Sequence, residues 1–107
     1  MKELIEQRLK ELGYKLGHYD KELDKVLTKK ALRQLLNSLN YGSIDLFIRI
    51  RRKLYIVNIV DIENEEHEID ICLYDNEEYF SIQGNLENAL ENENITKEEY
   101  KKYKKQS

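Results

Sequence analysis

The sequence of 107 residues predicts an α+β fold: an N-terminal helical hairpin, an antiparallel sheet of about four strands, and one or two short C-terminal helices. Three observations support this. Apolar residues recur at helical spacing in the first third of the chain, the spacing then changes to every second residue, and helix-capping signals return near the C-terminus. A chain of this length has room for one hydrophobic core, so we expect a single domain over residues 1–107.

Two helices are expected before residue 40. Residues 2–12 carry four aliphatic side chains on one stripe, and Gly13 is suited to end that helix in a left-handed cap. Asp20 is suited to cap a longer helix that runs to about residue 39, and Thr28 is the alternative cap of a separate second half. Residues 14–19, which include a glycine, are expected to form the loop of the hairpin.

Four strands are expected next. Residues 43–51 and 68–74 alternate between apolar and polar side chains, as half-buried strands do. Residues 54–62 are apolar on both faces, which is typical of a central strand covered on two sides. Residues 51–53 are the expected tight turn, although they lack the Gly or Asn that such turns favour. A polar turn then precedes a shorter fourth strand over residues 79–83.

The C-terminal part returns to helix. Gly84 and Asn85 are expected to open a helical stretch over residues 86–92. Thr96 followed by Glu99 fits a capping box for a last helix. That helix is short and mostly polar, so residues 97–107 are expected to fray as a basic tail.

Charge is unevenly distributed along the chain. Residues 61–96 contain twelve Asp and Glu residues and no Lys or Arg, whereas residues 1–60 contain thirteen basic and seven acidic residues. A formal net charge of −3 therefore conceals an acidic segment between two basic ones. Ordinary protein surfaces intersperse both signs, so this segregation introduces a charged partner as an alternative to the plainer interpretation, a solvated surface that is acidic only for solubility.

The acidic segment provides the main candidate site. Alternate residues of a strand are about 6.6–6.8 Å apart, roughly two phosphate steps of a nucleic-acid strand. Carboxylates displayed at that spacing would mimic a nucleic-acid backbone and attract a basic groove of a protein that binds nucleic acid. Tyrosines are common at interfaces, so two of them are added as candidate contact anchors, although half-buried lids over a small core are the plainer interpretation. The predicted partner-binding residues are Asp61, Glu63, Glu65, Glu66, Glu68, Asp70, Tyr74, Glu77, Glu78 and Tyr79.

The basic turn is the alternative site. Arg49, Arg51, Arg52 and Lys53 would neutralise phosphates if the protein bound nucleic acid directly. The competing interpretation is a charged hairpin tip that discourages aggregation of the sheet. The acidic net charge and the lack of a nucleic-acid-binding motif favour this second interpretation, so direct nucleic-acid binding is not expected.

One hairpin pattern matches a known family. Gly42-Ser43-Ile44-Asp45-Leu46, followed by Leu54-Tyr55-Ile56-Val57, resembles the core hairpin of PD-(D/E)xK nucleases, with Asp45 in place of the first carboxylate. The resemblance covers about 20 residues and implies a metal-dependent nuclease fold. The acid-x-Lys triplet of that family falls on Asn58-Ile59-Val60, so the second metal ligand and the lysine are missing. Two carboxylates are needed to hold Mg²⁺, which argues against activity of this type.

No other pattern indicates catalysis, a metal or a cofactor. Cys72 is the only cysteine, and His18 and His67 are far apart and form no zinc motif. We therefore expect a protein that is not an enzyme and needs no cofactor. No apolar run approaches the ~20 residues that span a bilayer, so no membrane association is expected, and the lone cysteine fits the cytoplasm, that of the host cell if the gene belongs to a phage.

These features predict a small non-catalytic binding protein that occupies a basic surface of a nucleic-acid-handling protein. Natural proteins of this type are phage inhibitors of host defence and immunity proteins against toxin nucleases. Two alternatives remain: a degenerate nuclease-like or nucleic-acid-binding domain that uses the basic turn, and a homo-oligomer in which basic helices of one chain meet acidic strands of another.

Overall fold

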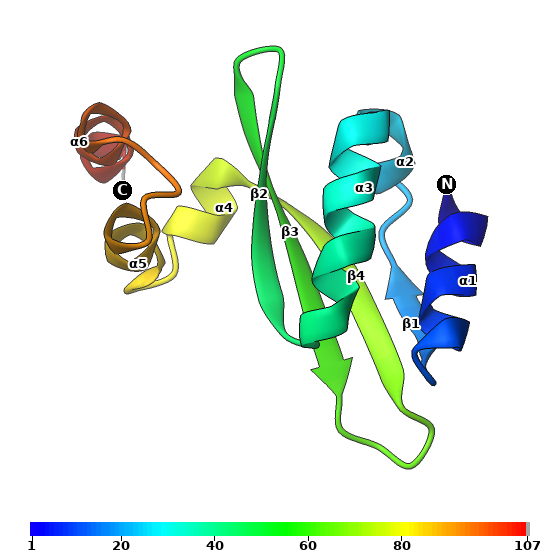
Figure 1. Cartoon of the computed structure of the whole chain (residues 1–107). Coiled ribbons are helices and arrows are strands. Elements are labelled where there is room, and N and C mark those ends of the chain that lie inside the picture. Colours follow the sequence, from blue (N-terminus) through cyan, green and yellow to red (C-terminus); the bar gives the residue numbers. More distant parts are fainter. Residues whose placement is uncertain (107) are drawn as a thin grey trace.

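The structure, a computed structural model, describes residues 1–106 and confirms the α+β class. Its four strands form one mixed sheet in the order β1-β4-β3-β2, in which β1 is parallel to β4 and the other pairs are antiparallel (Figure 1). In chain order the elements are α1 (Lys2–Glu11), β1 (Lys15–Tyr19), α2 (Leu23–Val26), α3 (Lys29–Ser38), the 3-10 helix η1 (Leu39–Tyr41), β2 (Ile44–Ile50), β3 (Lys53–Ile62), β4 (Glu68–Asp75), α4 (Asn76–Phe80), α5 (Asn85–Glu91) and α6 (Lys97–Gln106).

The expected loop over residues 14–19 is wrong, because most of it is strand β1. The glycine that suggested a loop lies within the strand, against two carboxylates of β4. A Cβ atom at Gly17 would collide with Oδ1 of Asp70 on β4 and lie 3.0 Å from a carboxylate oxygen of Glu68. Without that atom β1 lies close to β4, and the backbone N–H of His18 donates to Asp70 at 2.7 Å. The sheet is therefore mixed and not antiparallel throughout.

The long helix expected from Asp20 is also divided. Leu27 adopts an extended backbone, and the Thr28 side chain accepts a hydrogen bond from the N–H of Ala31 at 3.1 Å, which starts α3. The alternative cap at Thr28 is thus confirmed. Because a strand and the short α2 separate α1 from α3, the predicted helical hairpin is wrong in its connection.

The fourth predicted strand, residues 79–83, is wrong as well. Asp75 caps a helix by accepting the N–H of Glu78 at 2.8 Å, so the polar segment read as a turn begins α4. Tyr79 and Phe80 are adjacent in sequence and both buried. Adjacent residues of a strand point to opposite faces, whereas a short helix allows both to reach the same cluster.

Strand β3 lies between two hydrophobic clusters. Val57 and Ile59 belong to the larger cluster, which α1, α2 and α3 complete on one face of the sheet. Leu54 and Ile56 belong to a smaller cluster under α4, α5 and α6 on the other face. Figure 1 shows the two groups of helices on opposite sides of the strands. The prediction that this strand is central and covered on both faces is confirmed.

The C-terminal helices follow the sequence signals closely. The capping box is present, because Glu99 N–H donates to Thr96 Oγ1 at 3.1 Å and Thr96 N–H donates to Glu99 Oε1 at 3.0 Å. The expectation of a frayed tail is wrong for α6, where the Tyr103 ring stacks on Phe80 at a centroid distance of 5.0 Å. Residue 107 lies outside the described residues. None of the helices in residues 1–106 is long and apolar enough to cross a membrane.

The hairpin between β2 and β3 turns at Arg51 and Arg52, as predicted. Both residues have positive φ, 51° and 69°, in a two-residue turn that pairs Ile50 with Lys53. Turns of this kind favour Asn followed by Gly, because a Cβ atom is strained in the left-handed region. The chain therefore holds two arginines at a position where they destabilise the turn.

Replacing this pair, Arg51→Asn/Arg52→Gly, is expected to raise the free energy of unfolding by about 1 kcal/mol, because the strain is removed. Urea unfolding measures the change. The control Arg51→Gln/Arg52→Gln removes the same two charges but keeps the strained backbone, and should change stability by less than about 0.5 kcal/mol. A loss of stability in the Asn-Gly variant would contradict this account of the turn.

Candidate functional site

Strand β4 divides the predicted acidic surface into two groups of side chains. One group lies where β3 passes into β4, and the other lies on or next to α4. The eight residues of β4 span about 23 Å at ~3.3 Å per residue, so Glu63, Glu65 and Glu66 before the strand lie at the opposite end from Glu77 and Glu78 after it. The first group, named the acidic end here, comprises Asp61, Glu63, Glu65, Glu66, Glu68 and Asp70, and the second comprises Tyr74, Glu77, Glu78 and Tyr79.

A lysine from β1 neutralises part of the acidic end. The Nζ atom of Lys15 forms ion pairs with Glu66 and Glu68, with a distance of 3.2 Å to Oε1 of Glu68. The hydrogen bond from Lys15 lowers the pKa of the Glu66 carboxyl, and the hydrogen bonds to Glu66 and Glu68 raise the pKa of Lys15. This role of Lys15 is not visible in the sequence, because residues 14–19 were expected to form a loop and not a strand beside β4.

Two other carboxylates of the acidic end have structural partners. Asp70 accepts the backbone N–H of His18 and so helps to hold β1 against β4. Asp61 is half-buried and accepts a hydrogen bond from the Tyr14 hydroxyl at 3.4 Å. These two side chains are therefore part of the packing between the first strand and the rest of the sheet, and their oxygens are only partly available to a partner.

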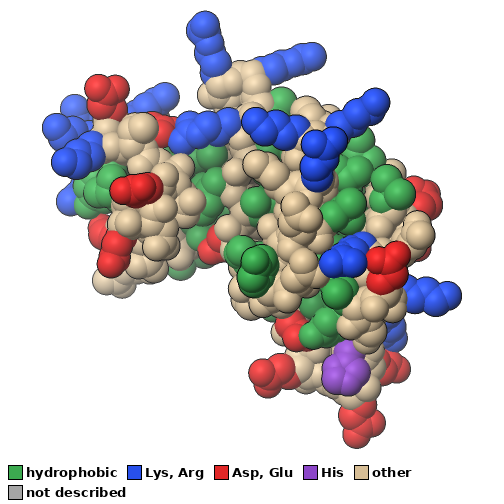
Figure 2. All heavy atoms as spheres, in the orientation of Figure 1, with side chains coloured by type: hydrophobic (Ala, Val, Ile, Leu, Met, Phe, Trp, Pro, Cys, Tyr) green, Lys and Arg blue, Asp and Glu red, His purple; other side chains and the backbone are tan. Residues whose placement is uncertain are grey.

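The remaining carboxylates of the acidic end are exposed in the loop between β3 and β4. Glu63, Glu65 and Glu66 all lie in this loop, which closes at His67 with a positive φ of 52°. Neither Glu63 nor Glu65 forms an ion pair within residues 1–106. In Figure 2 acidic side chains surround a histidine at the lower tip of the molecule, while basic side chains gather along its upper part.

The second group is less accessible than the sequence suggested. Tyr79 is only 7% exposed, and its hydroxyl donates a hydrogen bond to Asp45 of β2. Burial is the main cause that raises the pKa of the Tyr79 hydroxyl, and the hydrogen bond to Asp45 raises it further. Tyr74 is half-buried, whereas Glu77 and Glu78 are exposed in the first turn of α4. Tyr79 therefore anchors α4 to the sheet and does not lie on a surface that a partner could reach.

The basic turn projects at the opposite end of β3 from the acidic loop. Arg51, Arg52 and Lys53 are exposed there, and a cavity of about 440 Å³ lies beside the turn, with Lys25 in its lining. Arg49 is not part of this group, because its guanidinium turns toward α6. The structure thus brings together three of the four basic residues predicted for the alternative site.

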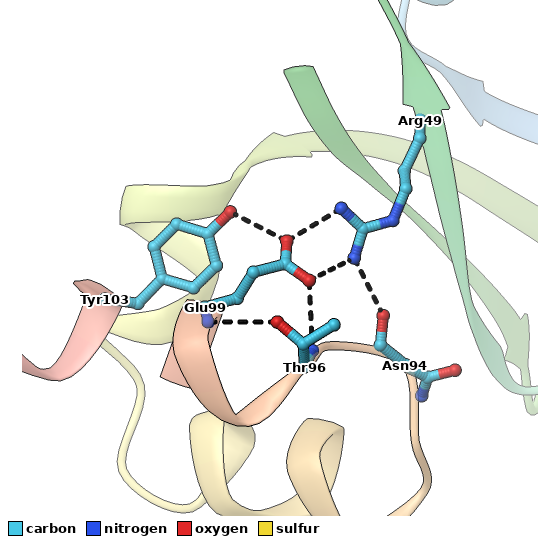
Figure 3. A network of polar contacts seen from close by, with 5 residues as sticks. All are labelled: Arg49, Asn94, Thr96, Glu99 and Tyr103. Atoms are coloured by element: carbon cyan, nitrogen blue, oxygen red, sulfur yellow. Dashed lines mark hydrogen bonds and ion pairs between the residues drawn. The ribbon is translucent and has the colours of Figure 1, made fainter. Parts of the chain in front are cut away.

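Arg49 instead organises a polar network between β2 and the last helix (Figure 3). Its Nη1 and Nη2 atoms donate to the two carboxylate oxygens of Glu99, each at 2.7 Å, and Nη2 also donates to the Asn94 carbonyl at 3.2 Å. Glu99 accepts further bonds from Thr96 N–H and from the Tyr103 hydroxyl. The hydrogen bond from Arg49 lowers the pKa of the Glu99 carboxyl, and the bond to Glu99 raises that of Arg49.

The nuclease-like hairpin pairs Asp45 with an amide and not with a second carboxylate. Asn58 lies directly across from Asp45 on β3, and its Nδ2 atom donates to Oδ1 of Asp45 at 2.7 Å. The second oxygen of Asp45 accepts the Tyr79 hydroxyl. Within the described part of the chain, no group of three His, Cys, Asp or Glu side chains is arranged to hold a metal ion. Asp45 therefore acts here as a hydrogen-bond acceptor that joins β2, β3 and α4.

Comparisons with known proteins found no match: no family model, no curated protein and no solved structure is similar to this chain. The candidate sites therefore rest on their own geometry. They are the acidic end around the β3–β4 loop and the basic turn at the far end of the same strand.

The Arg49–Glu99 pair predicts a specific acid sensitivity. A carboxyl whose pKa falls on folding adds stability above its unfolded pKa, about 4.3, and loses it as the pH falls through the lower folded value. At pH 7, Glu99→Gln should lower the free energy of unfolding by on the order of 1 kcal/mol, a modest loss because Arg49 is half exposed and the ion pair is screened by solvent. The difference in stability between the variant and the unmodified protein should shrink toward pH 3.

Urea unfolding at several pH values measures this difference. Glu98→Gln is the matched control, because Glu98 lies in the same first turn of α6 but is exposed and forms no ion pair within residues 1–106. It shares the helix-dipole effect with Glu99. Equal losses in the two variants, or a Glu99→Gln loss that does not depend on pH, would show that the pair with Arg49 is not the cause.

Proposed function

We propose that the protein is a small non-catalytic binding protein whose acidic end occupies a basic surface of a protein that handles nucleic acid. The observation that carries the proposal is the loop between β3 and β4, which displays Glu63, Glu65 and Glu66 together at one tip of the molecule. The nearby cation, Lys15, contacts only the last of these three. A projecting tip with excess negative charge speeds encounter with a basic groove and orients the complex.

The position of the charge supports a specific contact over general solubility. Carboxylates that serve only solubility need not lie close together. The three exposed carboxylates at this tip fall within four consecutive positions of the chain, at the end of β3 that is farthest from the basic turn. The resulting charge separation along the molecule would guide a partner to one end. Inhibitors of host defence and immunity proteins against basic toxins are natural proteins of this type.

The test is binding to a panel of purified basic nucleases, measured from ~50 to ~300 mM salt. The variant Glu63→Gln/Glu65→Gln/Glu66→Gln should weaken binding about tenfold or more and reduce its salt dependence, because the partner loses its steering charge. The control Glu77→Gln/Glu78→Gln/Glu91→Gln removes the same charge from exposed positions of α4 and α5, and should change binding less than about twofold.

Two results would contradict the proposal. Equal weakening in both triple variants would mean that net charge and not the acidic end determines binding. Retention of no basic protein at the lowest salt would mean that the acidic end has no partner of this class.

A specific observation also favours a second candidate, direct nucleic-acid binding at the basic turn. Arg51 and Arg52 occupy strained positions where Asn and Gly would be more stable, and such strain is found more often at functional sites. Their guanidinium groups form no ion pair within residues 1–106, so they are available to phosphates.

Fluorescence anisotropy with labelled single- and double-stranded DNA and RNA tests this candidate. If the turn binds phosphates, Arg51→Asn/Arg52→Gly should weaken binding about tenfold while the fold becomes more stable, so loss of binding could not be assigned to unfolding. Affinity that is unchanged in this variant, or absent from the unmodified protein at ~50 mM salt, would exclude the candidate.

A further inference from the structure

Strand β2 is an unprotected edge of the sheet. The opposite edge, β1, has five residues, carries a register irregularity and packs beside α1. In contrast, β2 has seven residues that pair with β3 in unbroken register, and the chain contains no proline. Natural sheets protect their edges with short strands, bulges, prolines or covering elements, and β2 has none of the first three.

Alternate backbone groups of β2 point away from the sheet. In a two-residue hairpin the flanking residues, here Ile50 and Lys53, form a hydrogen-bonded pair, and hydrogen-bonded pairs then alternate along the ladder. The N–H and C=O groups of Asp45, Phe47 and Arg49 therefore face outward. No hydrogen bond within residues 1–106 reaches these backbone groups.

The charged side chains of β2 do not protect this edge either. Charged residues discourage strand addition when their side chains extend into solvent. Arg49 is turned toward Glu99 and the Asn94 carbonyl, and Asp45 is held by Asn58 and the buried Tyr79. Both side chains are exposed, but each is fixed by these contacts with the rest of the molecule.

A groove runs along the exposed edge. A cavity of about 420 Å³ lies between β2 and α5, and a second of about 340 Å³ lies between β2, α3 and the segment that carries Glu93 and Asn94. Phe47 and Asn94 line both cavities, so the two cavities are adjacent along β2. Figure 1 shows β2 between α3 and the C-terminal helices. The edge of β2 is thus flanked by cavities on both sides.

The cavity beside α5 indicates the chemistry of the occupant. Its charged lining residue is Asp45, which forms no ion pair with a cation in the described part of the chain. Side-chain amides supply further oxygen acceptors, and no Lys or Arg lines this cavity. A carboxylate surrounded by carboxamides favours a Lys or Arg side chain. The amides belong to Asn85, Asn88, Asn92 and Asn94.

We propose that the β2 edge binds an extended segment of the basic partner as a fifth strand, with a Lys or Arg side chain in the cavity beside Asp45. The exposed edge from Asp45 to Arg49 spans about 13 Å, which a segment of about five residues covers. Main-chain hydrogen bonds to Asp45, Phe47 and Arg49 provide affinity, and the cavity provides selectivity. The inference rests on the proposed function only for the basic character of the partner.

The experiment uses the full-length protein as bait for a display library of random segments of about seven residues. Selected segments should carry Lys or Arg at one position and β-branched residues at alternate ones. In the presence of a selected peptide, hydrogen exchange at the amides of Asp45, Phe47 and Arg49 should slow at least about tenfold, because these groups become hydrogen-bonded.

Asn88→Lys places a cation in the cavity without changing β2, and should weaken peptide binding about tenfold. Gln7→Lys is the matched control. It adds the same charge at an exposed position of α1, away from the groove, and should leave peptide binding unchanged. The Glu63→Gln/Glu65→Gln/Glu66→Gln variant should still bind the peptide, so failure of the acidic end and failure of the groove are distinguishable.

Three results would overturn the inference. One is a selection without enrichment of Lys or Arg. The second is that a selected peptide slows hydrogen exchange at amides outside β2 and not at those of β2. The third is a dimer in solution that protects the amides of Asp45, Phe47 and Arg49 without any peptide, because a second copy would then occupy the edge.

Discussion

The structure depends on one constraint: strand β3 is apolar on both faces and must be covered on both. Val57 and Ile59 require the helices α1 to α3 on one face, and Leu54 and Ile56 require the smaller cluster under α4 to α6 on the other. The second cluster covers only the end of the sheet near the basic turn. Burial of this strand therefore sets which parts of the sheet remain accessible.

The same constraint separates the charges of the molecule. Because β3 runs from the basic turn to the acidic loop, its two ends carry opposite charge, and β4 returns the chain to the side of α4. The acidic segment of the sequence is thereby divided. Some of its carboxylates cap a helix or hold β1, as Asp75 and Asp70 do, and others remain exposed. A charge count along the sequence cannot distinguish these roles, since each depends on a partner from another element.

Regular periodicity predicted α1, β2, β3 and β4, and capping signals predicted α5 and α6, although α6 was expected to fray. The errors have local physical causes. Gly17 resembled a loop residue because its close approach to Asp70 depends on a strand about 50 residues away in sequence. Asp75 resembled a turn residue because turns and helix caps use the same side-chain acceptor. The acidic loop and the basic turn were predictable from charge, whereas the pairing of Lys15 with Glu66 and of Arg49 with Glu99 required the tertiary structure.

Hydrogen exchange of the isolated protein tests this account most directly, because it reports both the covered strand and the exposed edge. The amides of Val57 and Ile59 should exchange only on global unfolding and be among the slowest in the chain. Along β2, the amides of Leu46 and Ile48 should be protected while that of Phe47 exchanges rapidly. Exchange in β3 as fast as in α6, or uniform protection along β2, would contradict the central role of β3 and the accessibility of the β2 edge.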